Sequence, residues 1–179
     1  MLLIQPDKGW LTIKEAAYNP KQVYGYYLLP MLFLSSLASV LFVGKNFEQV
    51  TLSPNQLFLI NFISFAAAIY GSGFLIASLA PRFKGISSSD YAITLIAFAY
   101  IPVFLASMLS VIHPSLQIIN LVAVIYMIFL FAKGSRILME VPDQKHIGFT
   151  VVSLIILFLM RILLSVFITA LLGGGNTMS

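Results

Sequence analysis

The sequence contains no cysteine, and only 9% of its 179 residues are charged. The absence of cysteine excludes disulfides, thiolate metal sites and cysteine nucleophiles in any compartment. The scarcity of charge accompanies 60% hydrophobic residues and a mean hydropathy of +0.99. Soluble domains carry about 25% charged residues, so this composition excludes an ordinary soluble domain. The chain is therefore expected to be an integral membrane protein.

Histidine and carboxylate are also too scarce or too scattered for most catalytic sites. The two histidines, His113 and His146, fall in loops expected on opposite sides of a bilayer core about 30 Å thick, so they cannot share a metal. None of the six acidic residues lies inside an apolar run, which argues against an acid-based proton relay. Lys and Arg occur singly rather than in a basic stripe, which argues against nucleic acid as a partner. We expect no catalytic centre, no metal site and no cofactor.

Five apolar runs reach the length of about 20 residues that crosses a bilayer core. They cover residues 24–44, 56–80, 91–112, 115–133 and 148–172. Short joints containing Pro, Gly and polar residues separate them, so consecutive helices should pack antiparallel. The expected fold class is all-α, with residues 23–173 forming a bundle of five transmembrane helices.

Small residues at a spacing of four mark the second of these runs. Ser64, Ala68 and Ser72 lie on one such line. Helices in lipid associate by close backbone approach, which small residues permit. The second span is therefore expected at the centre of the bundle.

The N-terminal segment, residues 1–22, precedes the first span. Its residues Trp10, Ile13 and Ala17 share one helical face. Such a helix can lie along the inner membrane interface with Trp10 as an anchor at headgroup depth; the alternative is a short solvated lead-in. At the other end of the chain, residues 174–179 are expected to form a flexible tail.

Lys and Arg are distributed unevenly between the loops. Three precede the first span, two lie before the third and three before the fifth, whereas the opposite side has Lys45 alone. Cytoplasmic loops keep the excess of these residues. The N-terminus is therefore expected in the cytoplasm and the C-terminus outside.

Two stretches, YAITLIAFAYIPVFLASMLSVI and IYMIFLFAKGSRILMEVPDQKHIGFTVV, resemble the Yip (Ypt-interacting protein) domain family, particularly its short bacterial members. The opening PDKGWLTIKE is similar to the start of those members. The residues that carry the resemblance are Tyr100, Pro102, Tyr126, Gly134, Leu138, Met139, Pro142, Lys145 and Gly148.

This resemblance implies a multi-pass protein of the bacterial inner membrane, with five spans and a cytoplasmic N-terminus. The same orientation follows independently from the Lys and Arg counts. Eukaryotic members associate with Rab-type GTPases through a cytosolic N-terminal region much longer than residues 1–22. The resemblance therefore does not lead us to expect that this chain binds a GTPase.

The last apolar run, LIILFLMRILLSVFITALL, contains one charge, Arg161. Its insertion penalty of about 2.5–3.5 kcal/mol is smaller than the roughly 4–8 kcal/mol contributed by the fourteen Leu, Ile, Phe and Val residues of the run. Insertion therefore needs no partner, but Arg161 is too far from either end of the span to snorkel. Ser153, eight residues before Arg161, and Ser165 and Thr169, four and eight residues after it, lie on the same line, which predicts a polar face directed into the bundle.

Arg161 has two possible roles. No acid lies at its depth, so the expected acceptors are the side chains of Asn120, Tyr126 and Tyr100 and the Phe98 carbonyl freed by the following proline. These would make a structural clamp that ties the fifth span to the hairpin of the third and fourth. Alternatively, an anion such as a lipid phosphate meets Arg161 in a polar crevice.

Two functions consequently remain open. The first is a non-catalytic scaffold or membrane-organising component whose partners are lipids, other membrane proteins or a second copy. The second is a small transporter or lipid-handling protein with a polar crevice around Arg161. A crevice open at Arg161 would favour the second function, and a closed dry bundle would favour the first. An intramembrane enzyme is the least expected class.

Overall fold

The computed structural model describes residues 2–15, 23–46 and 52–173, and these form helices and turns without a strand. In chain order the elements are α1 (Pro6–Glu15), η1 (Val23–Leu28), α3 (Leu29–Asn46), α4 (Pro54–Leu79), η2 (Ala80–Phe83), α5 (Ser89–Ala99), α6 (Ile101–Ser110), η3 (Pro114–Leu116), α7 (Gln117–Leu138) and α8 (Asp143–Gly173). The segments long and apolar enough to cross a membrane are Val23–Gly44, Pro54–Phe83, Ser89–Ser110, Gln117–Leu138 and Asp143–Gly173. The all-α fold with five spans is confirmed. The predicted tail, 174–179, and Ala17 lie outside the described residues.

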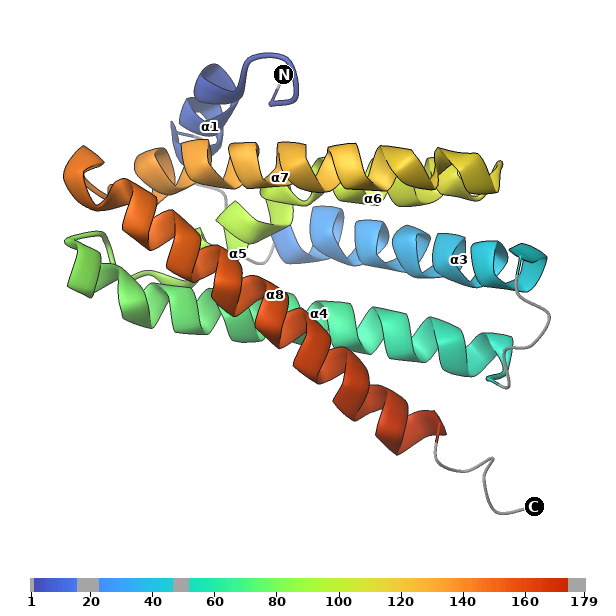
Figure 1. The fold of residues 1–179 in the computed structure, drawn as a ribbon. Helices are drawn as coiled ribbons and strands as arrows, with labels where there is room; N and C mark the ends of the chain where they lie inside the picture. Colours follow the sequence, from blue (N-terminus) through green and yellow to red (C-terminus); the bar gives the residue numbers. More distant parts are fainter. Residues whose placement is uncertain (1, 16–22, 47–51, 174–179) are drawn as a thin grey trace.

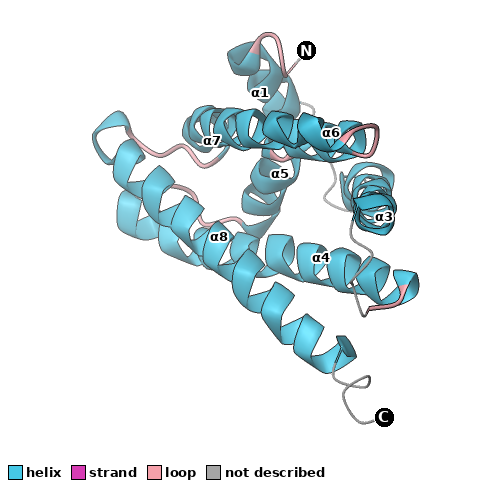
Figure 2. Cartoon of the chain, turned by 45° about the vertical axis from the view of Figure 1, so that its right-hand side comes forward, coloured by secondary structure: helices cyan, strands magenta, loops and turns pink. Residues whose placement is uncertain are grey.

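The spans are arranged in two layers (Figure 2). One layer holds α3, α6 and α7, the other holds α4 and α8, and α5 runs between them. α4 contacts α8 within its own layer, α5 between the layers, and α3 in the other layer. α8 crosses α4 obliquely and diverges from α7 toward its own C-terminal end (Figure 1). This divergence leaves much of the C-terminal half of α8 exposed.

The third span consists of two helices rather than the continuous one expected over 91–112. α5 ends at Ala99 and α6 begins at Ile101, with a change of direction between them (Figure 2). Pro102 occupies the first turn of α6, where a missing N–H costs no helical hydrogen bond. The Tyr100 N–H donates to the Ile96 carbonyl at 3.1 Å, and the Tyr100 carbonyl accepts from the Phe104 N–H at 3.0 Å. The break therefore leaves Tyr100 with both of its backbone groups paired.

The most buried helix of the bundle is α5, while the second span, α4, contacts α3, α5 and α8. Residues 92–97 are all buried. Small residues on the neighbouring helices make room for them: a Cβ at Gly73 of α4 would lie 2.3 Å from Ile93, and one at Gly134 of α7 would lie 2.5 Å from Leu95. The small residues of α4 thus serve contact with α5 on one side and with α8 on another.

The loops gather at two ends of the bundle (Figure 1). One end, here called the charged end, consists of the turns at 80–88 and 139–142 and the first turns of α8, with α1 nearby. The two turns are joined by the Ile86 N–H, which donates to the Met139 carbonyl at 2.8 Å. The opposite end holds the start of α4, the turn at 111–116 and the end of α8. The described Lys and Arg of the loops predicted on one side therefore lie together at the charged end.

Candidate functional site

Arg161 lies near the middle of α8 and faces α4. Its Nη1 donates a hydrogen bond to Ser64 Oγ at 2.9 Å. The guanidinium carbon lies 4.5 Å from the centre of the Phe65 ring, a cation–π contact worth about 0.5–2 kcal/mol. The Phe65 ring in turn meets Tyr100 edge-on, with 5.2 Å between ring centres. The site is thus built from α8, from two consecutive residues of α4 and from the break between α5 and α6.

Most donors of the Arg161 guanidinium have no acceptor among the described residues. A guanidinium carries five N–H donors, and the described residues accept a hydrogen bond from one of them. The ion pairs found in the described part of the chain are Lys14–Glu140, Lys133–Asp7 and Arg136–Asp143, and none of them includes Arg161. The cation therefore keeps donors for an acceptor from outside the protein.

Arg161 lines an open cavity of about 320 Å³, here called the Arg161 crevice, together with Ile162, Ser165 and Val166. Ile162 and Val166 are 60% and 65% exposed. At the helical rise, Arg161 is about 27 Å from Asp143 and about 18 Å from Gly173. The crevice consequently opens on the side of α8, far from both helix ends, where a bilayer would present hydrocarbon.

The predicted hydrogen bonds from Arg161 to Asn120 and Tyr126 were wrong. Asn120 Nδ2 donates instead to Ser110 Oγ at 2.6 Å, and the Tyr126 hydroxyl donates to the Leu3 carbonyl at 2.6 Å. α8 tilts away from α7 as it leaves the charged end (Figure 1), so equal depth in the membrane does not bring these side chains together. Arg161 joins α8 to α4.

The predicted polar face of α8 is divided between the crevice and the helix contact. Ser165 lines the crevice, and Thr169 is half-buried farther toward the opposite end. Ser153 is fully buried, as is Ser72 of α4, and neither hydroxyl has a hydrogen-bond partner in the described structure. A buried polar group without a partner costs about 1–3 kcal/mol. The two unpaired hydroxyls therefore lower the stability of the fold, and packing alone gives no reason for them.

The antiparallel pairing of α4 and α8 places these two hydroxyls at one level. The hydrogen bond between Ser64 and Arg161 sets the register of the two helices. Ser72 follows Ser64 by two helical turns, and Ser153 precedes Arg161 by the same number. Both hydroxyls therefore lie about 12 Å from the crevice toward the charged end.

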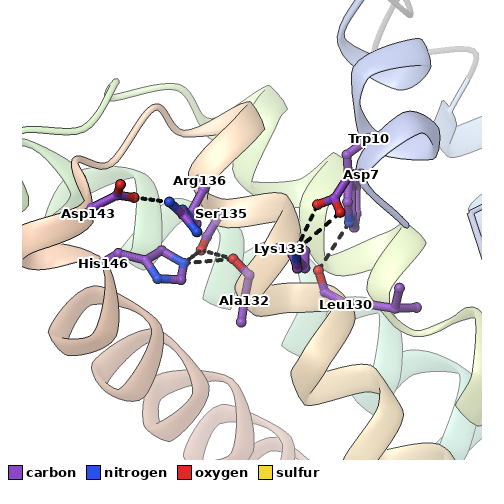
Figure 3. Close-up of polar contacts among 9 residues, drawn as sticks. All are labelled: Asp7, Trp10, Leu130, Ala132, Lys133, Ser135, Arg136, Asp143 and His146. Carbon is purple, nitrogen blue, oxygen red and sulfur yellow. Dashed lines mark hydrogen bonds and ion pairs between the residues drawn. The ribbon is translucent and has the colours of Figure 1, made fainter. Parts of the chain in front are cut away.

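A second polar cluster joins α7 to α8 at the charged end (Figure 3). His146 Nε2 lies 2.7 Å from the Ala132 carbonyl oxygen and 3.0 Å from Ser135 Oγ, with Thr150 Oγ1 at 3.3 Å. A carbonyl oxygen only accepts, so the short contact assigns a proton to Nε2 and leaves that nitrogen no lone pair for the serine proton. Ser135 Oγ lies 2.9 Å from the same carbonyl, to which it donates, and its side chain is fully buried. The pair joins two helices, and the Ser135 hydroxyl donates to the Ala132 carbonyl in this arrangement.

Trp10 contacts protein and not lipid headgroups, so its predicted role as an interfacial anchor was wrong. Its side chain is fully buried, and Nε1 donates to the Leu130 carbonyl of α7 at 3.1 Å (Figure 3). A Cβ at Gly134 would lie 2.6 Å from the indole, so glycine is what lets the ring sit on α7. The ion pair between Asp7 and Lys133, 3.0 Å long, lies beside it. α1 is therefore docked on α7.

Most residues that carry the family resemblance lie at the charged end and at the contact of α1 with α7. Those at the turn between α7 and α8 are Leu138, Met139, Pro142, Lys145 and Gly148. Lys145 Nζ donates to the Arg82 carbonyl at 3.2 Å, and a Cβ at Gly148 would lie 3.2 Å from the Phe83 ring. These residues hold the turns of the charged end together. Tyr100, through its contact with Phe65, is the member of the set that reaches the Arg161 site.

Sequence reasoning did not identify Phe65 and considered Ser64 only as a packing residue. A signal was present, because Ser64 lies near the middle of its span, as Arg161 does, and the two spans run antiparallel. However, several hydrogen-bond acceptors lie at the same depth in the membrane as Arg161. The choice among them depends on the tilt of α8.

Comparison with known proteins assigns the chain to a family. Searches of curated proteins and of solved structures gave no significant match. A family model described as the Yip1 domain matches residues 1–171, from before α1 to the last turn of α8, with Arg161 and the docked α1 inside the match. This match covers more than nine-tenths of a chain that has five membrane-spanning segments, and the chain therefore belongs to the Yip1 domain family.

Proposed function

We propose that this membrane protein is a non-catalytic, lipid-handling component of the cytoplasmic membrane that binds the phosphate of anionic lipids in the Arg161 crevice. The observation that carries the proposal is the open cavity beside a guanidinium with one protein acceptor among the described residues. An open crevice favours this function over a purely structural scaffold, because a clamp residue would have its donors satisfied inside the bundle.

The chemistry of the crevice fits a phosphate. A guanidinium offers parallel N–H donors that match two phosphate oxygens, and Ser165, one turn along the same face, adds a hydroxyl donor. No described carboxylate competes for the cation. Each charge-assisted hydrogen bond is worth about 1.5–3 kcal/mol.

The position of the crevice favours lipid as the source of that phosphate. Its rim consists of the exposed side chains of Ile162 and Val166, which suit acyl chains better than water. The charged end, with its excess of Lys and Arg, suits the cytoplasmic side by the positive-inside rule. This orientation puts the N-terminus in the cytoplasm and the C-terminus outside.

The test is retention of lipid by the purified protein. Native mass spectrometry from nanodiscs containing phosphatidylglycerol and phosphatidylcholine should show the anionic lipid retained by the wild type. Arg161→Gln removes the charge but keeps a hydrogen-bond donor near Ser64, so it should weaken retention by about 10- to 150-fold, the equivalent of one charge-assisted hydrogen bond.

A matched control uses the exposed Arg82 in the turn at 80–88. Arg82→Gln removes the same charge from the charged end and should leave retention unchanged. Equal retention by wild type and Arg161→Gln would refute lipid binding at the crevice.

A further inference from the structure

Polar side chains continue from the Arg161 crevice along the whole membrane-crossing length of α8. In order from the opposite end to the charged end they are Thr169, Ser165, Arg161 and Ser153, and then Thr150 and His146, which contact Ser135 of α7 rather than α4. The first and last are about 35 Å apart along the helix, against a hydrocarbon core of about 30 Å. The line is interrupted at Leu157, which is buried.

The middle of this line contains polar atoms that the closed helix contact leaves unsatisfied. Ser153 and Ser72 are both 0% exposed, and neither hydroxyl has a partner in the described structure. Buried hydroxyls are normally paired with protein or water. A polar group passing between α4 and α8 at this level would receive hydrogen bonds that the closed contact does not provide.

The contact that closes this part of the α4–α8 seam contains small and flexible side chains beside the buried Leu157. Ala68 and Gly71 face it from α4, and a Cβ at Gly71 would lie 2.6 Å from the terminal methyl of Met160. Methionine has three rotatable side-chain bonds and adapts readily to a changed environment. On the other side of the crevice the two helices are tied by Gln56 Nε2, which donates to the Leu172 carbonyl at 2.9 Å.

We propose that phospholipid headgroups cross the bilayer along this α4–α8 seam, so that the protein exchanges lipid between the two leaflets. The inference rests on the proposed function, since the Arg161 crevice is the entry. The seam offers N–H and O–H donors and no described carboxylate, which suits a phosphate and not a cation. Free phosphate has the same chemistry, but the exposed apolar side chains of Ile162 and Val166 that line the crevice favour a headgroup whose acyl chains stay in lipid.

The experiment measures lipid exchange by the full chain in vesicles of phosphatidylcholine and phosphatidylglycerol that contain a trace of fluorescent phosphatidylglycerol. Dithionite bleaches the outer leaflet only, so loss of the protected inner-leaflet signal reports exchange. The wild type should remove that signal, while protein-free vesicles keep it. The double variant Ser72→Ala and Ser153→Ala should slow the exchange by about tenfold or more, since each hydroxyl lost removes a hydrogen bond to a charged phosphate.

Two further measurements separate the possible outcomes. The double variant removes unpaired hydroxyls and should unfold at a temperature equal to or higher than that of the wild type, whereas a merely structural pair would lower it. Ser78→Ala, at an exposed serine of α4, is the matched control and should exchange lipid at the wild-type rate. Slow exchange by the double variant with retained lipid in native mass spectrometry supports the path.

Two results would refute lipid exchange along the seam but leave lipid binding at the crevice intact. In the first, the wild type retains lipid without accelerating exchange; in the second, the double variant exchanges lipid as fast as the wild type. A failure of the proposed function itself is distinguishable, because Arg161→Gln would then retain as much lipid as the wild type. Release of entrapped radiolabelled phosphate without lipid exchange would assign the seam to free phosphate and overturn its assignment to lipid.

Discussion

Substitution of Gly134 by alanine should weaken the docking of α1 on α7. The added Cβ would lie 2.6 and 2.7 Å from two carbons of the Trp10 indole and 2.5 Å from Leu95 Cδ1. Leu95 is fully buried in α5 and has little room to move, whereas α1 is a short helix at the surface of the bundle. The indole is therefore the group that must give way.

The expected magnitude follows from what holds the indole in place. A buried tryptophan removes about 150–250 Å² from water, equivalent to about 4–6 kcal/mol as an upper estimate. The hydrogen bond from Nε1 to the Leu130 carbonyl adds about 0.5–1.5 kcal/mol. Overpacking by one methyl group typically costs about 1–3 kcal/mol, which lowers the ratio of docked to undocked α1 by about 5- to 150-fold.

Fluorescence reads this equilibrium directly, because Trp10 is the sole tryptophan of the chain. The wild type should emit as a buried indole and resist quenching by acrylamide and by bromine-labelled lipid. Gly134→Ala should shift the emission to the red and increase quenching. Gly44→Ala is the control, since its Cβ would have no neighbour within 4 Å.

Two results would refute this reasoning. If Gly134→Ala leaves both emission and quenching at wild-type values, the indole is not seated on Gly134. If bromine-labelled lipid quenches the wild type as strongly as the variant, Trp10 contacts lipid and the buried position is incorrect.

Two other substitutions test contacts that position the crevice and α1. Phe65→Leu removes the aromatic ring that contacts Arg161 and should lower the free energy of unfolding by about 0.5–2 kcal/mol. Thermal unfolding in detergent measures this loss, which should be smaller when Arg161 is already replaced by Gln. Lys14→Glu places two acids together where Lys14 Nζ now lies 2.5 Å from Glu140, and should increase acrylamide quenching of Trp10. The paired reversal with Glu140→Lys should restore the wild-type quenching, and failure to do so would show that the ion pair does not hold α1.

Hydropathy predicted the number of spans because lipid demands about 20 consecutive apolar residues for each helix. The same measure could not reveal the break at Tyr100, since both α5 and α6 are apolar. Pro102 is compatible with a kinked helix and with the first turn of a new one. Packing of α5 between α4 and α7 decides between these alternatives.

Charge identified the centre of the candidate site but not its partners. Arg161 stands out because a lone cation within an apolar run is rare. Its contacts with Ser64 and Phe65 depend on the oblique crossing of α8 over α4, and Asn120 was favoured for equal depth although α8 leads away from it. The position of Trp10 was missed for a related reason, because an amphipathic helix has the same pattern whether its apolar face meets lipid or α7.

The sequence by itself determined a five-span, all-α membrane protein, the separation of charge between its two sets of loops, and the lone cation in the middle of a span, since each follows from the cost of placing charge and unpaired backbone in hydrocarbon. Only the tertiary structure decided which helices meet, where the third span breaks, and that Arg161 lines an open crevice. Contacts between apolar helices in lipid depend on the fit of small residues and on tilt. That information is spread over pairs of residues far apart in the chain, and no local pattern of hydropathy contains it.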